Sequence, residues 1–164
     1  AGLWAYSIGD TIKFVSKSPY RIKVTGRIKH FISAFGEHVI GEEVEFALMT
    51  AAKEINLVIA EFTVAPQVNP IDSGLPYHEW FIETDEAIVE DKRLQLASLL
   101  DASMQRRNIY YRDLIQGNVL RPAVLTFVRS GAFNDYMRSV GKLGGQNKVP
   151  RLANDRGIAD SLSS

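Results

Sequence analysis

The sequence contains no cysteine among its 164 residues. Disulfide bonds, thiolate catalysis and zinc sites with cysteine ligands are therefore excluded. An excess of one charge is absent as well, because nineteen lysine and arginine residues balance nineteen aspartate and glutamate residues. This balance gives no support to a general nucleic-acid or membrane-surface binder, so we expect neither kind of partner. A cytoplasmic location is consistent with the missing cysteines and is our expectation.

Long hydrophobic runs are missing too. The longest ones, residues 57–60 and 123–128, are far shorter than the ~20 residues that a membrane-spanning helix needs. The first ten residues, AGLWAYSIGD, lack the basic start and the apolar core of a secretory signal. They begin without methionine, in what reads as a strand followed by a turn, and we therefore expect the chain to be a fragment of a longer protein.

The composition that is present fits one soluble domain. Of the residues, 46% are hydrophobic and 23% are charged, which is ordinary for a globular protein. A chain of 164 residues is long enough to bury one core and too short to be divided safely into two.

Alternating residues predict extended strands near the start of the chain. Apolar and basic residues alternate over residues 20–25, which predicts a half-buried strand. Ser18-Pro19 separates this run from another one at residues 11–15, so the two runs predict a short β-hairpin. Residues 28–34 form a further extended candidate.

Beyond Gly36 the hydrophobic period changes to that of a helix. Apolar residues recur at helical spacing over residues 41–55, and three glutamates lie near its start, where the helix dipole favours acids. A second helix is expected to begin at a Thr84-Asp85 cap and to run to about residue 108. A third helix is predicted over residues 132–140.

Three runs rich in strand-forming residues, 57–65, 77–83 and 123–128, complete the pattern. A loop rich in proline and glycine joins the first two, which predicts that they are antiparallel neighbours. The order of strands and helices predicts an α+β fold with a small, mainly antiparallel sheet flanked by helices and preceded by the β-hairpin. We expect residues 141–164 to form a mostly polar tail around one basic patch.

Two residues are candidates for binding a nucleotide. Asp10 follows a glycine in a tight turn, where its carboxylate could accept hydrogen bonds from a vicinal diol such as a ribose. Spacing alone fits a turn-stabilising aspartate better. Arg27 could reach a phosphate or a ribose with its planar, permanently charged guanidinium, although a solvated arginine at a strand end is the commoner case.

Lys148 is the sharpest candidate for catalysis. It lies in a glycine-rich segment, and Arg151 adds a second positive charge three residues later. A lysine delivered to a developing phosphoryl charge stabilises the transition state electrostatically. The plainer alternative is an exposed lysine in a polar tail. A phosphate-cradling P-loop is excluded, because the Gly-Lys pair at residues 141–142 is followed by leucine rather than by serine or threonine.

The histidines show no spacing typical of metal ligands, so we interpret them as packing or surface residues and expect no metal site. They are His30, His38 and His78. No Ser-His-Asp order and no paired-carboxylate spacing suggests nucleophilic or acid–base catalysis either.

Three stretches resemble motifs of the adenylate-forming enzyme superfamily, in the same order along the chain. The hinge-and-loop motif is matched by residues 26–45, GRIKHFISAFGEHVIGEEVE. The C-terminal lysine motif is matched by residues 147–153, NKVPRLA, and the motif that ends the large domain by residues 2–10, GLWAYSIGD. Within that superfamily the chain looks most like the acyl acid amido synthetases of the auxin-responsive Gretchen Hagen three family.

The resemblance implies a domain organisation and a reaction. Residues 1–25 would end the large-domain motif and form a hairpin leading to the hinge, and residues 26–164 would be the C-terminal small domain, inactive by itself. In this family a carboxylic acid and ATP give an acyl-adenylate and pyrophosphate, and an amino acid then displaces AMP to form an amide. The implied partner is the protein's own N-terminal adenylation domain, which would bind most of the ATP and magnesium.

The resemblance also implies roles for individual residues. Lys148 would be catalytic, bridging the carboxylate and the α-phosphate during adenylation. Asp10 and Arg27 would bind the nucleotide, and Lys29 would lie at the domain hinge. One loop would face the active site for the second step after the small domain has rotated. This second-step loop consists of Gly36, Glu37 and His38.

Two other interpretations stay open from the sequence. The nearest one is the C-terminal domain of an acyl-CoA ligase, in which the second step makes a thioester. The other, from a different functional class, is a non-catalytic α+β binding module whose lysine segment is only a tail.

Overall fold

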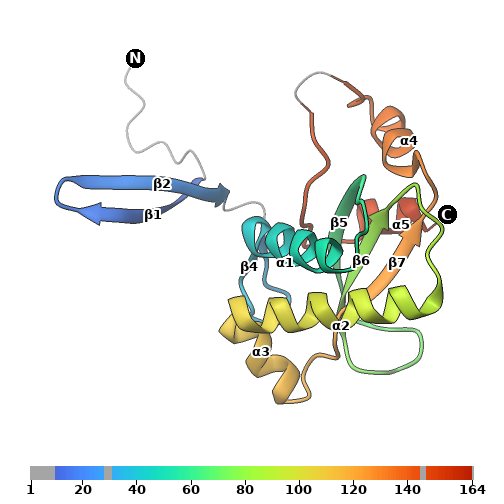
Figure 1. Cartoon of the computed structure of the whole chain (residues 1–164), viewed down its shortest axis with the longest axis horizontal. Coiled ribbons are helices and arrows are strands. Elements are labelled where there is room, and N and C mark those ends of the chain that lie inside the picture. Colours follow the sequence, from blue (N-terminus) through green and yellow to red (C-terminus); the bar gives the residue numbers. More distant parts are fainter. Residues whose placement is uncertain (1–9, 28–30, 145–146, 164) are drawn as a thin grey trace.

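The computed structural model describes residues 10–27, 31–144 and 147–163. Figure 1 shows a β-hairpin that projects from a body made of a central sheet and its surrounding helices. The predicted α+β class, with a small sheet flanked by helices and preceded by a hairpin, is confirmed. None of the helices in the described ranges combines the length and the apolar character that a bilayer crossing demands.

The hairpin pairs β1 (Asp10–Lys17) with β2 (Tyr20–Arg27) in an antiparallel ladder. Directly opposed residues lie on the same face, and Phe14 is opposed to Ile22. The sequence predicts a half-buried strand here, but Ile22 and Val24 are 55% and 57% exposed. This apolar face stays exposed because a ladder of two strands has no second layer of its own to pack on.

The central sheet has the order β5-β6-β7 and is built from β5 (Glu61–Gln67), β6 (Tyr77–Glu83) and β7 (Val124–Val128). β5 and β6 are antiparallel, which confirms the pairing predicted for these two runs. β6 and β7 are parallel. Parallel neighbours need a long crossover connection, and the chain supplies it as helices between the two strands.

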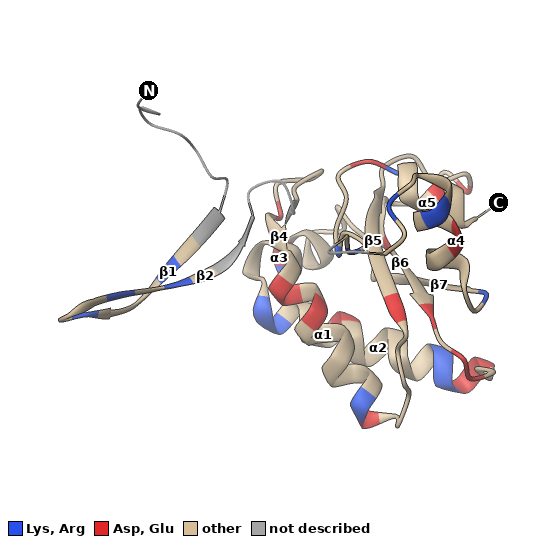
Figure 2. Ribbon diagram, turned by 90° about the horizontal axis from the view of Figure 1, so that it is seen from above, with Lys and Arg blue, Asp and Glu red and all other residues tan. Residues whose placement is uncertain are grey.

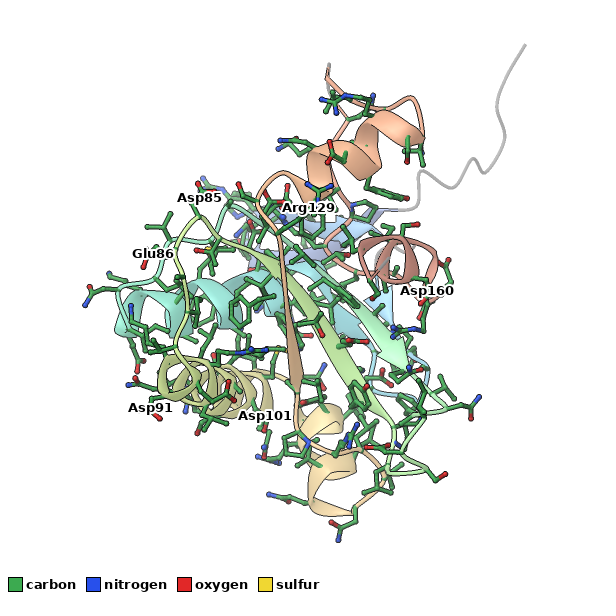
Figure 3. The ribbon with its side chains drawn as sticks, turned by 90° about the vertical axis from the view of Figure 1, so that its right-hand side faces the viewer. Asp85, Glu86, Asp91, Asp101, Arg129 and Asp160 are labelled. Atoms are coloured by element: carbon green, nitrogen blue, oxygen red, sulfur yellow. The ribbon has the colours of Figure 1, made fainter. Side chains whose placement is uncertain are left out.

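Helices cover both faces of this sheet, as Figure 3 shows. α1 (Gly41–Glu54) and α2 (Glu90–Arg107) pack on one face, and α4 (Ala132–Ser139) and α5 (Gly157–Leu162) pack on the other. Side chains alternate along a strand, so the sheet separates two cores. The strand residues of the larger core are Phe62, Val64, Trp80 and Ile82, and those of the smaller core are Ala65 and Phe81. The helices predicted over residues 41–55 and 132–140 are confirmed.

The second long helix begins later than the sequence predicts. α2 starts at Glu90, so the cap predicted at Thr84-Asp85 is wrong. Thr84 Oγ1 accepts a hydrogen bond from the amide of Glu86 at 3.3 Å and closes a local turn instead. The Asp85 carboxylate accepts a hydrogen bond of 2.7 Å from the hydroxyl of Ser130, which follows β7. Both side chains therefore stabilise the loop before the helix, where Figure 3 labels Asp85 and Glu86.

A short helix, α3 (Ile109–Gln116), follows α2 directly and is absent from the sequence-based prediction. Asn108 separates the two helices, and its side-chain oxygen accepts a hydrogen bond from the amide of Tyr111 at 2.8 Å. This is the bond of an N-terminal helix cap, which satisfies an amide that has no partner within the helix.

The segment after residue 146 corrects the prediction of a polar tail. Four of its apolar residues are buried: Val149, Leu152, Ile158 and Ala159. Leu152 joins the larger core, and Val149 and Ala159 join the smaller one. The backbone amide of Val64 in β5 donates to Arg151 O, and the amide of Ala153 donates back to Val64 O, each at 3.0 Å. The segment thus runs parallel to the edge of the sheet before it enters α5.

Candidate functional site

The predicted second-step loop lies between two very short strands, β3 (Phe31–Ile32) and β4 (Val39–Ile40), which pair in an antiparallel ladder. The strand predicted over residues 28–34 is therefore only two residues long within the described range. Gly36 and His38 have φ angles of 88° and 46°. This left-handed region costs glycine nothing but strains histidine, so contacts around the loop must hold it in place.

Glu37, between these two residues, turns its carboxylate into the core. Glu37 is fully buried, and its Oε1 lies 2.8 Å from Nε2 of His78 on β6, which is 1% exposed. Its other oxygen, Oε2, accepts a hydrogen bond of 2.8 Å from the amide of Phe35. Burial by itself raises the pKa of the Glu37 carboxyl, but the bonds from His78 and from backbone amides outweigh it and hold this pKa below its ordinary value. An ionised carboxylate only accepts, so Nε2 of His78 donates.

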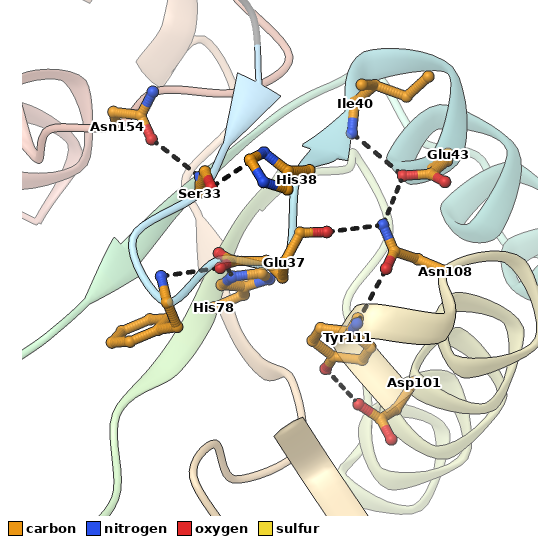
Figure 4. A network of polar contacts seen from close by, with 11 residues as sticks. Ser33, Glu37, His38, Ile40, Glu43, His78, Asp101, Asn108, Tyr111 and Asn154 are labelled. Carbon is orange, nitrogen blue, oxygen red and sulfur yellow. Dashed lines mark hydrogen bonds and ion pairs between the residues drawn. The ribbon is translucent and has the colours of Figure 1, made fainter. Parts of the chain in front are cut away.

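Asn108, the cap of α3, joins this loop to the start of α1 (Figure 4). Its side-chain nitrogen donates to the backbone oxygen of Glu37 at 3.0 Å and to Oε2 of Glu43 at 3.1 Å. The same Glu43 oxygen accepts a bond from the amide of Ile40 at 3.1 Å. The glutamates at the start of α1 are expected to serve the helix, and Glu43 does so while also anchoring Asn108.

Tyr111 and Asp101 support the buried His78. The Tyr111 ring stacks on the His78 ring, with centroids 5.3 Å apart. The Tyr111 hydroxyl donates to Asp101 Oδ1 at 2.5 Å, and the same oxygen accepts from the amide of Ala123 at 3.1 Å. Burial and the nearby Asp101 carboxylate raise the pKa of the Tyr111 hydroxyl well above its ordinary value. The phenol is therefore a fixed neutral donor, and the stack holds the imidazole of His78 in place.

The C-terminal segment contacts the same loop from the other side. The amide of Ser33 donates to the side-chain oxygen of Asn154 at 3.2 Å, and the hydroxyl of Ser33 is 3.1 Å from Nδ1 of His38. Upstream in this segment, Arg151 forms an ion pair with Glu61, and its guanidinium lies 4.5 Å from the ring centroid of Phe62. These contacts fix the backbone that follows Lys148.

A cavity of about 460 Å³ lies between the hairpin and the start of α1, next to β4. Lys13 and Lys23 line it from the hairpin, and Glu42 and Glu43 line it from α1, with Arg107 at the end of α2. Figure 2 shows the same contrast, with basic residues along the hairpin and acidic residues at the start of α1. The opposite charges favour a close approach of these two elements.

The structure brings some of the sequence-predicted site residues together. Asp10 and Arg27 lie opposite each other in register at the open end of the hairpin. Lys148 is exposed, and the bond between Ser33 and Asn154 joins its segment to the residues just before the second-step loop. Lys29 lies outside the described residues.

Sequence reasoning missed the residues that hold this loop. His78 is correctly interpreted as a packing histidine, but nothing in its surroundings along the chain indicates a carboxylate partner 41 residues away. Asn108 had a usable signal, since an asparagine before a run of helix-forming residues is typical of a helix cap. Within the described ranges, no group of three or more His, Asp or Glu side chains is arranged to hold a metal ion.

The chain is similar to a known family and to solved structures. A sequence model of the GH3 family C-terminal domain matches residues 42–157. The structure of a GH3.15 acyl acid amido synthetase is similar over 99% of this chain, with a TM-score of 0.77 and 18% sequence identity. A structure described as AtGH3.15 acyl acid amido synthetase in complex with 2,4-DB gives a TM-score of 0.72 and 17% identity, again over 99% of this chain.

These matches concern only part of the solved proteins. The chain spans 31% and 30% of the length of the two solved structures. No curated protein matches the chain. At these identities the structural likeness establishes the fold, which is the fold described above.

Proposed function

Because this chain belongs to the GH3 family as its C-terminal domain, we propose that it is the small domain of an ATP-dependent acyl acid amido synthetase. The observation that supports this most strongly is the likeness of almost the whole chain to a GH3.15 acyl acid amido synthetase, at a TM-score of 0.77. The three sequence motifs support the same activity independently of the fold.

The proposed reaction has two steps. In the first, a carboxylate attacks the α-phosphorus of ATP, and pyrophosphate leaves from an acyl-adenylate. In the second, an amino acid amine attacks the acyl carbon, and AMP leaves as the amide forms. The substrates are thus ATP, a carboxylic acid and an amino acid.

Lys148 is the residue to which we assign the first step. Its exposed ammonium group stabilises the negative charge that builds up between the carboxylate and the α-phosphate. The backbone immediately after it is fixed to β5, because Thr63 donates to Pro150 O at 2.8 Å. The lysine is thus presented from a rigid support.

Nucleotide contacts are assigned to the open end of the hairpin. Asp10 would bind the ribose hydroxyls, and Arg27, opposite it in the ladder, would contact ribose or phosphate. Lys29 would be the hinge about which residues 26–164 rotate between the two steps. As the resemblance to the adenylate-forming enzymes implies, we assign the magnesium that accompanies ATP mainly to the large domain.

The large N-terminal domain is the proposed partner of this chain. The solved relatives are about three times longer, and the chain matches less than a third of each. An isolated small domain would lack the surfaces that bind ATP and the acyl group, so we expect it to be inactive alone.

Replacing Lys148 tests the assignment in the full-length protein. We expect Lys148→Ala to reduce carboxylate-dependent pyrophosphate exchange by about 100-fold or more, because the electrostatic stabilisation of the transition state is lost. ATP binding, measured by calorimetry, should stay within about twofold, since the large domain holds the nucleotide.

Lys142→Ala is the matched control, because Lys142 is an exposed lysine of the same region without an assigned role. Unchanged exchange in Lys148→Ala, or an equal loss in both variants, would refute the catalytic assignment. Supplying the acyl-adenylate with amino acids or with coenzyme A then distinguishes an amide-forming enzyme from a thioester-forming one.

A further inference from the structure

The loop from Ser33 to His38 is held in a costly conformation. His38 has a left-handed backbone, and the carboxylate of Glu37 beside it is fully buried. Each of these features disfavours the observed conformation unless specific contacts compensate for it. The contacts of Glu37 therefore indicate the role of the loop.

The two carboxylate oxygens of Glu37 connect two separate parts of the fold. Oε2 accepts from the amide of Phe35 within the loop, whereas Oε1 accepts from His78 on the central sheet. The backbone oxygen of Glu37 accepts from Asn108. Side chain and backbone of one residue thus tie the loop to β6 and to the junction of two helices.

The described contacts of the His78 ring are with Tyr111 and Glu37. Its ring stacks on Tyr111, its Nε2 donates to Glu37, and its Nδ1 is buried without a hydrogen-bond partner among the described residues. Burying a hydrogen-bonded carboxylate seldom stabilises a protein more than well-packed apolar residues of the same size would. A gain in stability alone is thus a weak reason for this pair, and a defined loop geometry is a better one.

We propose that Glu37 and His78 are positioning residues for the second step, which hold the backbone of Gly36 and His38 in the shape that the acyl-adenylate meets after domain rotation. Both side chains are buried, so neither touches a substrate. This inference rests on the proposed function, because it gives a mechanical basis to the loop assigned to amide formation.

Three variants of the full-length protein separate positioning from bulk stability. His78→Leu places an apolar side chain against Tyr111 and leaves Oε1 of Glu37 without its donor. His78→Gln keeps a donor at a similar reach. Tyr111→Phe is the matched control, because it removes the buried bond to Asp101 and keeps the ring that stacks on His78.

The two half-reactions are measured separately in each variant. We expect His78→Leu to lower the rate of amide formation from a preformed acyl-adenylate by at least about tenfold, since small misplacements of active-site groups cost this much or more. Pyrophosphate exchange should change by less than about threefold, because we assign this loop to the second step. His78→Gln should recover most of the lost rate, and Tyr111→Phe should affect both half-reactions equally.

Hydrogen exchange gives a readout that does not depend on activity. In His78→Leu the amides of residues 33–40 should exchange faster, whereas those of Tyr111→Phe should match the parent there. In His78→Leu, equal losses in both half-reactions, or unchanged hydrogen exchange in this loop, would overturn the inference. If the parent protein forms no acyl-adenylate, the proposed function fails, and the exchange data still decide whether the pair fixes the loop.

Discussion

A buried carboxylate such as that of Glu37 persists only where bonds replace the water that it has lost. Here the replacement comes from a backbone amide, at Phe35, and from the imidazole of His78, both at 2.8 Å. The lowered pKa of Glu37 follows from these bonds, which act against the effect of burial. The contribution of Glu37 to the stability of the protein therefore depends on the ionisation of its carboxyl group.

The pH dependence of unfolding tests this directly. The pKa of Glu37 is lower in the folded chain than its ordinary value of 4.5, so its contribution to stability is present above pH 4.5. That contribution is lost as the pH falls from 4.5 through the lower pKa of the folded state. Urea unfolding of the chain should therefore show a shallower acid-side decline in Glu37→Gln than in the parent.

Other carboxylates with lowered pKa values are present in both the parent and Glu37→Gln, so their effects on the pH dependence of unfolding cancel in the comparison. The pKa of Asp72 is lowered by the Gly74 amide and by Arg121, and that of Asp135 by Arg129. Curves that stay parallel between the parent and Glu37→Gln across the acid range would contradict the assignment.

At the scale of elements, residues 147–163 are a folded segment that packs beside β5 at the edge of the sheet, rather than a tail. Leu152 bridges Val64 in a parallel arrangement beside β5 and is 1% exposed. Val149 and Ala159 close the smaller core on the opposite face from α1. The segment that carries Lys148 is therefore positioned by the core itself.

Truncating Leu152 should show this dependence. We expect Leu152→Ala to reduce the free energy of unfolding by about 2–5 kcal/mol, through lost apolar burial and the cavity left behind. Leu143→Ala, at a site 46% exposed, should change it by less than about 0.5 kcal/mol. Similar urea midpoints for the two variants would mean that the segment is not part of the folded core.

For the whole molecule, the sequence predicts those elements whose signals are local. α1 is predicted by its apolar period and acidic start, and the antiparallel pair β5 and β6 by two strand-forming runs around a turn-rich loop. The start of α2 is mispredicted because Thr84 and Asp85 find partners in a turn and near β7 instead of a helix. Such a choice is made by tertiary contacts, which the local sequence does not contain.

The candidate site divides in the same way. Motif resemblance points to Lys148 and to the loop around Gly36, because motif residues are close in sequence. His78 and Asn108 lie 41 and 71 residues from Glu37 and meet it only once the sheet and helices are packed. The supporting residues of the loop are thus a property of the fold, whereas its tip can be recognised in the sequence.

The hairpin gives a last prediction about the complete protein. Its apolar face includes Phe14 at 56% and Ile22 at 55% exposure. Covering this face with another layer would bury apolar surface and stabilise the protein. We expect the large domain to provide that layer, so hydroxyl-radical labelling of both residues should be weaker in the full-length protein than in this chain alone. Ile71, fully exposed in a loop, should label equally in the two samples. If Phe14 and Ile22 are labelled to the same extent in the full-length protein and in this chain alone, the hairpin lies outside the contact between the domains.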